Sequence, residues 1–100
     1  MKRYAVIIMP EAENNLQDAY SFIAQDSPRN ALQWYLQMRD AIQTLETLPL
    51  RCPLAPEDNV FEEEIRQLIV GNYRLLYSVR DPKVYILHIR HSARRWLSPE

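Results

Sequence analysis

The chain has 100 residues, of which 47% are hydrophobic and 25% are charged, and its formal net charge is −1. These values suit one small globular domain, and we expect residues 1–100 to fold as a single unit. No apolar run approaches the roughly 20 residues of a membrane-spanning helix, and the lone Cys52 excludes an internal disulfide. We therefore expect a cytoplasmic protein that has no metal site and needs no cofactor.

The first half of the chain predicts one strand and two helices. Tyr4–Met9 is apolar and rich in β-branched residues, as in a short strand. Helices are expected over Pro10–Gln25 and over Pro28–Leu48, with Ser27 as the N-cap of the second. Each helix has one apolar face at steps of three and four, formed by Ala12, Leu16, Ala19 and Ile23 and by Ala31, Tyr35, Met38, Ile42 and Leu45. The short corner between the helices favours an antiparallel hairpin.

The second half predicts three consecutive strands. These are Ile65–Val70, Tyr73–Arg80 and Val84–His91, and the Gly71-Asn72 pair between the first two is typical of a two-residue hairpin turn. The resulting β-α-α-β-β-β order predicts an α+β fold, in which the helical hairpin packs on one face of a small, mostly antiparallel sheet.

Two segments before these strands lack periodicity. Leu50–Phe61, which contains two prolines, is predicted to be an irregular connection and the best candidate for a mobile segment. Glu62–Glu64 is a local acidic run, and we expect it to be solvated.

The turn after Arg80 decides which side chains share a face of the sheet. We expect Asp81-Pro82-Lys83 to form a three-residue loop, because a two-residue loop would mix apolar and polar side chains. The pairs that would then face each other are Arg80 with Val84, Leu76 with His88, and Arg74 with Arg90. In this register the helix-covered core contains Leu75, Leu87, Ile42 and Met38, and the open face carries Arg74, His88 and Arg90.

Charge is distributed unevenly along the chain. The first 64 residues carry a net charge of −6, and the rest carry +5, which suggests a basic face for an anionic partner. Two arginines directly opposite each other repel unless an anion lies between them. Arg74 could bind such an anion, or it could pair with an acid in Glu62–Glu64 or with the C-terminal carboxylate. Both readings remain open.

The Arg and His side chains are the main candidates for chemistry. Arginines could stabilise phosphorane charge and a histidine could transfer protons during RNA cleavage, but the same group could equally bind a partner. The spacing supports no Ser-His-Asp triad, no phosphate-binding glycine loop and no set of metal ligands.

Three segments, YAVIIMPEAENNL, GNYRLLYSV and VYILHIRHSARR, are similar to the RelE/ParE superfamily of toxins from bacterial type II toxin–antitoxin modules. Members are often labelled plasmid stabilisation proteins. Together with the order of the elements, the resemblance covers essentially the whole chain. It implies a small toxin that inhibits growth and is neutralised by a cognate antitoxin protein encoded beside it. We expect the antitoxin to contact the outer side of the helical hairpin or the last strand.

The superfamily has two main branches. RelE-like members cut mRNA on the ribosome, whereas ParE-like members poison DNA gyrase. Arg74 matches the strand arginine of the RelE-like site, but no tyrosine follows Tyr85 to complete it. The resemblance therefore favours the ParE-like branch, for which the candidate target-binding residues are Arg74, Arg90, Arg94, Arg95 and Trp96. The alternative is a ribosome-dependent mRNA interferase, with catalytic candidates Arg74, His88, Arg90 and His91. Enzymatic activity is thus left open, and a merely structural antitoxin partner is a third reading.

Overall fold

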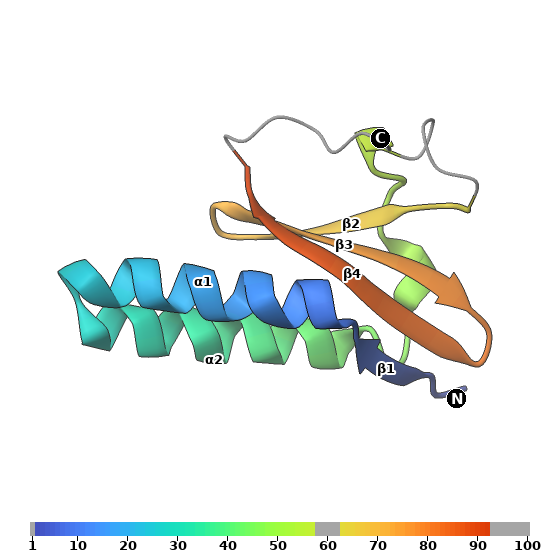
Figure 1. The fold of residues 1–100 in the computed structure, drawn as a ribbon. Helices are drawn as coiled ribbons and strands as arrows, with labels where there is room; N and C mark the ends of the chain where they lie inside the picture. Colours follow the sequence, from blue (N-terminus) through green and yellow to red (C-terminus); the bar gives the residue numbers. More distant parts are fainter. Residues whose placement is uncertain (1, 58–62, 93–100) are drawn as a thin grey trace.

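A four-stranded sheet lies against a hairpin of two helices (Figure 1). The computed structural model describes residues 2–57 and 63–92 of the chain. Its elements are β1 (Ala5–Ile8), α1 (Pro10–Asp26), α2 (Pro28–Thr44), the short 3-10 helix η1 (Pro49–Arg51), β2 (Arg66–Val70), β3 (Tyr73–Arg80) and β4 (Lys83–His91). The α+β class and the β-α-α-β-β-β order are confirmed.

The helices begin and end for local reasons. Pro10 and Pro28 open them, and the Ser27 hydroxyl accepts a hydrogen bond of 3.1 Å from the Asn30 N–H, as expected of an N-cap. The second helix ends at Thr44, short of the predicted Leu48. Arg51 stabilises the C-terminus of this helix, because its guanidinium donates to the Thr44 carbonyl at 3.3 Å and to the Thr44 hydroxyl at 2.7 Å.

The sheet is mixed, with the strand order β1-β4-β3-β2. Strand β1 pairs in parallel with β4, and the other two pairs are antiparallel. The main core lies between the sheet and the helices, where Met38 and Leu75 are fully buried and Ile42 is 7% exposed. These three core predictions are confirmed.

The β3–β4 turn differs from the prediction. Arg80 faces Lys83, so that the loop has two residues and the expected Arg80–Val84 pair is wrong. A β-bulge opposite Leu76 and Tyr77 then skips Leu87 and restores the predicted Leu76–His88 pair. The predicted pairing of Arg74 with Arg90 is also present.

The bulge changes the assignment of one core residue. Ile86 is fully buried in the main core, whereas Leu87 is half-buried and packs against Leu76 on the other face. The prediction that Leu87 lies in the helix-covered core is therefore wrong. Because side chains alternate along a strand, one extra residue moves the next side chain to the opposite face.

The face away from the helices carries a second, smaller core. Residues 52–57 pass from the helix layer to this side of the sheet (Figure 1), and Ala55 packs there with Ile65 and Leu76. Backbone hydrogen bonds fix the crossing, from Ala55 N–H to Ile65 at 2.7 Å and from Gln67 N–H to Pro53 at 3.1 Å. These hydrogen bonds give Pro53 and Ala55 a defined path within the expected irregular connection. Residues 58–61 of that connection lie outside the described residues, and its mobility stays a prediction.

Candidate functional site

Arg74 is a buried residue of β3 with a buried partner. Its Nη1 and Nη2 donate to the two carboxylate oxygens of Glu57, at 3.0 and 2.8 Å, and Nη1 also donates to Gln67 Oε1 at 3.2 Å. Arg74 is 6% exposed and Glu57 is 1% exposed. The sequence left two readings open for Arg74, a bound anion or an acid from Glu62–Glu64 or the C-terminus. The structure has an acid there, but it is Glu57, which was not among the acids named.

The segment before Glu57 explains how the pair forms. An isolated bridge between Leu54 and Arg66 extends the β2 edge, and Ala55 anchors the segment in the smaller core. Glu57 follows two residues later and reaches over the sheet to Arg74. Two charges taken out of water are stable only when they satisfy each other, and a bidentate guanidinium–carboxylate pair does so.

The acids beside β2 neutralise further arginines. Glu63 accepts from Arg80 at 3.0 and 2.6 Å, and Glu64 accepts from Arg66 at 3.3 Å. The prediction that the acidic run is merely solvated is therefore wrong for Glu63, which is only partly exposed, whereas the Glu64 side chain is 69% exposed to solvent. Glu62 lies outside the described residues. Three arginines of the basic half are paired with acids of residues 57–64.

Arg90 and His88 share the sheet face of Arg74, as predicted. Arg90 lies directly opposite Arg74, and His88 lies opposite Leu76. Burial lowers the pKa of the His88 imidazole below its usual value of 6.5. Glu11 and Glu57 oppose this shift and Arg90 adds to it. His88 is therefore a neutral imidazole at neutral pH.

His91 belongs to a different environment. It faces Tyr73, and the two rings meet edge-on with centroids 5.2 Å apart. Together with Asn15, Asp18 and Phe22 these residues line a hollow between α1 and the end of the sheet. The structure therefore separates His91 from the group formed by Arg74, His88 and Arg90.

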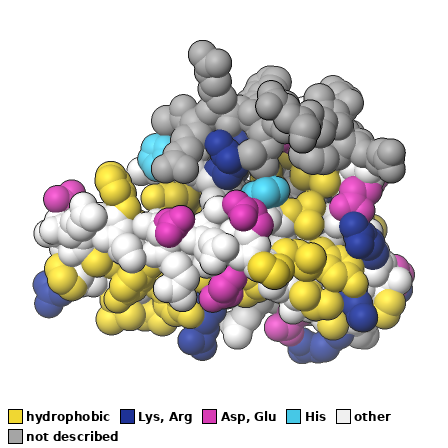
Figure 2. Space-filling view, in the orientation of Figure 1, with side chains coloured by type: hydrophobic (Ala, Val, Ile, Leu, Met, Phe, Trp, Pro, Cys, Tyr) yellow, Lys and Arg dark blue, Asp and Glu magenta, His cyan; other side chains and the backbone are white. Residues whose placement is uncertain are grey.

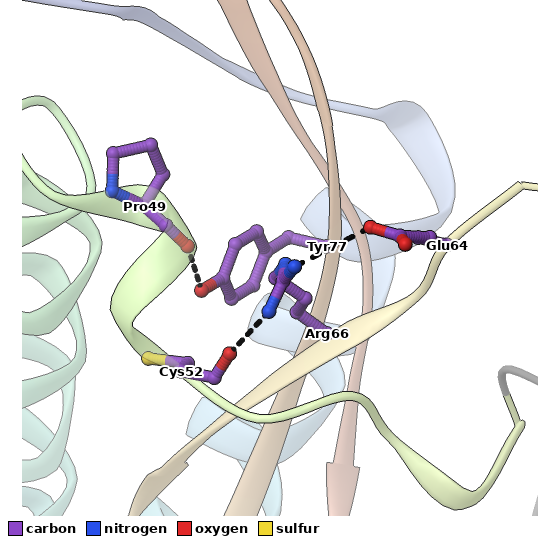
Figure 3. Close-up of polar contacts among 5 residues, drawn as sticks. All are labelled: Pro49, Cys52, Glu64, Arg66 and Tyr77. Carbon is purple, nitrogen blue, oxygen red and sulfur yellow. Dashed lines mark hydrogen bonds and ion pairs between the residues drawn. The ribbon is translucent and has the colours of Figure 1, made fainter.

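A second polar network holds the segment that follows α2 (Figure 3). The Tyr77 hydroxyl donates to the Pro49 carbonyl at 2.5 Å, and Arg66 Nη1 donates to the Cys52 carbonyl at 2.7 Å. Burial raises the pKa of Tyr77 far above its usual range, so the phenol stays protonated as a donor. No local pattern predicts this network, because its partners lie 14 and 28 residues apart in the chain.

The remaining predicted target-binding residues, Arg94, Arg95 and Trp96, lie outside the described residues. Within residues 2–57 and 63–92, His, Cys, Asp and Glu side chains form no group that could hold a metal ion. Over the same ranges no helix has the length and apolar character needed to cross a membrane.

The sequence and the fold were compared with known proteins. A family model described as "ParE toxin of type II toxin-antitoxin system, parDE" matches residues 6–96. No curated protein matches the chain. Solved structures with a similar fold include the chromosomal ParDE toxin–antitoxin system of P. aeruginosa, with a TM-score of 0.73 and 15% identity over 89% of this chain and 96% of that one.

Two further structures are similar over most of their length. One is in the toxin–antitoxin complex RelBE2 from Mycobacterium tuberculosis, with a TM-score of 0.58 and 26% identity over 89% of this chain and 98% of that chain. The other is in the archaeal RelE–RelB complex from Pyrococcus horikoshii, with a TM-score of 0.53 and 22% identity over 93% of this chain and 99% of that chain.

Proposed function

Because the chain belongs to the ParE toxin family of type II toxin–antitoxin systems, we propose that it inhibits growth by acting on DNA gyrase. In this proposal it has no catalytic activity of its own, works in the cytoplasm and is neutralised by a cognate antitoxin. The similar structures come from toxin–antitoxin systems and complexes, which supports the antitoxin as a partner.

The state of Arg74 is the observation that favours gyrase over mRNA. A RelE-like nuclease would aim this arginine at the negative charge that develops on the phosphate in the transition state. Here Glu57 already accepts from both terminal nitrogens of Arg74, and the side chain is buried. An arginine held in this way supports the fold rather than a reacting phosphate.

The C-terminal segment supplies the proposed contact with the target. Arg94, Arg95 and Trp96 are consecutive in the sequence. Arginine and tryptophan are enriched among the residues that dominate the binding energy of protein interfaces. We assign gyrase binding to these three side chains.

The decisive experiment compares two reactions of the intact protein. Purified gyrase and plasmid DNA test for inhibited supercoiling or accumulated cleavage complexes, and ribosomes programmed with message test for cleavage. We expect an effect on gyrase and no cut in the message. Codon-specific cuts that disappear in Arg74→Ala would overturn the proposal and establish the mRNA interferase.

Variants of the tail test the assigned contact. Deletion of residues 92–100 should leave a folded domain, because it keeps every residue of the main core that the structure describes. The deletion and the triple variant Arg94→Ala/Arg95→Ala/Trp96→Ala should both abolish growth inhibition and the effect on gyrase. The control is Arg29→Ala/Arg39→Ala, which removes two exposed arginines of α2. Full toxicity of the deletion variant would show that the C-terminal segment has no part in the mechanism.

The outer side of the helical hairpin is a proposed antitoxin surface. Leu32 is 51% exposed and Leu36 is 45% exposed. Leu32 also lines a hollow between the helices with Tyr20 and Tyr35. Figure 2 shows apolar side chains along this layer. Leu32→Glu should therefore weaken antitoxin binding while Gln33→Glu, at the next exposed position of α2, should not.

A further inference from the structure

A hollow of about 420 Å³ lies where α1 meets the far end of the sheet. Strand β1 pairs with β4 only as far as Ile86, and β4 then continues beside α1 (Figure 1). The volume of the hollow is within the range of about 300–1,000 Å³ that is typical of small-molecule sites. It is lined from α1 by Asn15, Asp18, Ala19 and Phe22 and from the sheet by Tyr73, Ile89 and His91.

The walls of this hollow are held in place by direct contacts. Asn15 Oδ1 accepts a hydrogen bond of 3.0 Å from the Ile89 N–H, which joins α1 to β4. The Trp34 ring of α2 packs against the Tyr73 ring with centroids 5.1 Å apart, and Tyr73 in turn meets His91 edge-on. Side chains that are fixed before binding lose little conformational entropy when a ligand arrives. The hollow is therefore preformed.

The lining combines aromatic rings with a carboxylate. Phe22, Tyr73 and His91 supply the rings, and Phe22 is 68% exposed although it is large and apolar. The exposed Asp18 precedes Phe22 by four residues, so both side chains lie on the same side of α1. Aromatic rings attract cations through their π faces, and a carboxylate attracts them through its charge. A cation is thus the one class of ligand that both parts of the lining favour.

The helix that forms one wall is acidic throughout. Helix α1 carries four acids and no lysine or arginine, which gives it a net charge of −4. A surface lined by charges of one sign raises the local concentration of ligands of the opposite sign. The charge of α1 therefore complements a positively charged ligand.

We propose that this hollow binds a small organic cation with a planar guanidinium group. Such a group stacks on an aromatic ring and donates hydrogen bonds to the Asp18 carboxylate at the same time. The seven described residues of the lining are far fewer than the about 20–30 that each partner contributes to a protein interface, which favours a small ligand. This site goes beyond the gyrase proposal, because it needs neither gyrase nor the C-terminal segment.

The test titrates propylguanidinium against the full-length protein and follows the amide signals by two-dimensional NMR. The control ligand is propylurea, which has a similar shape and no charge. We expect propylguanidinium to shift the signals of residues around the hollow, with a dissociation constant at least about tenfold below that of propylurea.

Two variants separate the contributions of charge and ring. Asp18→Asn keeps the shape of the side chain and removes its charge, and Phe22→Leu keeps an apolar side chain and removes the ring. Each should weaken the binding of propylguanidinium by about fivefold, and neither should unfold the protein, because both side chains are exposed. The control is Glu13→Gln, which removes an exposed carboxylate of α1 outside the hollow and should change binding by less than about twofold.

Each other outcome would overturn the proposal. Equal binding of propylguanidinium and propylurea would show that the site does not select a cation. Equal losses in Asp18→Asn and Glu13→Gln would assign the attraction to the whole of α1, and unchanged binding in Phe22→Leu would place the cation elsewhere. A short peptide with one central arginine is titrated in parallel. If the peptide binds and propylguanidinium does not, the hollow is a surface for protein segments and no small-molecule site.

Discussion

The two faces of the sheet are stabilised in different ways. The face toward the helices is apolar, with Leu75, Tyr77 and Ile86 fully buried against α1 and α2. The other face combines a small apolar cluster with the buried Arg74–Glu57 pair. Figure 2 shows histidine side chains and a basic side chain above α1. On the first face, the stability lost on mutation should grow with the side-chain volume removed. On the second face, removing one charge of the buried pair leaves the other without its partner, so that both have to be removed together to keep stability.

The largest expected effect comes from breaking the buried pair on one side. Arg74→Met leaves the Glu57 carboxylate buried without its main partner, which should lower the free energy of unfolding by about 3–5 kcal/mol. The double variant Arg74→Met/Glu57→Leu removes both charges and should recover most of that loss. Urea denaturation measures both.

The control for this cycle is the exposed pair. Arg80→Met breaks the contact with Glu63, in which the arginine side chain is 58% exposed, and it should change stability by no more than about 1 kcal/mol. Equal losses in Arg74→Met and Arg80→Met would show that burial of the Arg74–Glu57 pair adds nothing.

Matched leucines on the two faces should give the next largest effect. Leu75 is fully buried in the main core, so Leu75→Ala should cost roughly 2–5 kcal/mol. Leu87 is half-buried in the smaller cluster, so Leu87→Ala should cost less, because fewer atoms lose contacts. Melting temperatures of the two variants check this order, and a larger loss in Leu87→Ala would contradict the assignment of faces.

The helix-covered face could be read from the sequence because its signals are local. Apolar steps of three and four placed Met38 and Ile42 in the core, and the alternation along β3 placed Leu75 there. The bulge at Leu87 could not be read, because a two-residue turn and a three-residue turn both fit Asp81-Pro82-Lys83. The register follows from burial along the whole strand pair rather than from the turn alone.

The other face could be predicted only in part. Alternation along the strands brought Arg74, Arg90 and His88 to one side, as the structure has them. The partner of Arg74 lies in a segment without periodicity, 17 residues earlier in the chain. The acids named from the sequence were Glu62–Glu64 and the C-terminal carboxylate, and Glu57 was not among them. Only the path of residues 52–57 across the sheet brings Glu57 to Arg74.

A smaller effect is expected at the hydrogen bond that holds the segment after α2, just before residues 52–57 cross the sheet. Tyr77→Phe removes the hydroxyl that donates to the Pro49 carbonyl and should cost about 1–3 kcal/mol, because a buried acceptor loses its donor. Tyr20→Phe is the control. It keeps the edge-on ring contact with Tyr35 and should change stability by less than about 0.5 kcal/mol. If chemical denaturation shows equal losses of stability in Tyr77→Phe and Tyr20→Phe, the hydrogen bond of the Tyr77 hydroxyl contributes no specific stability.

The smallest expected effect is a pH dependence that belongs to the charged face alone. Burial lowers the pKa of His88 in the folded protein, against the opposing influence of Glu11 and Glu57 and with the help of Arg90. The unfolded chain therefore binds more protons than the folded one between the lowered pKa and about 6.5. Stability from this residue is fully present above that window and is lost as the pH falls through it. Uptake of one full proton would change the free energy of unfolding by about 1.4 kcal/mol per pH unit. The slope due to His88 should stay well below this, since the side chain is partly exposed to solvent. Urea denaturation of the wild type and His88→Gln between pH 5 and pH 8 measures the difference, and parallel curves would show that His88 contributes nothing to it.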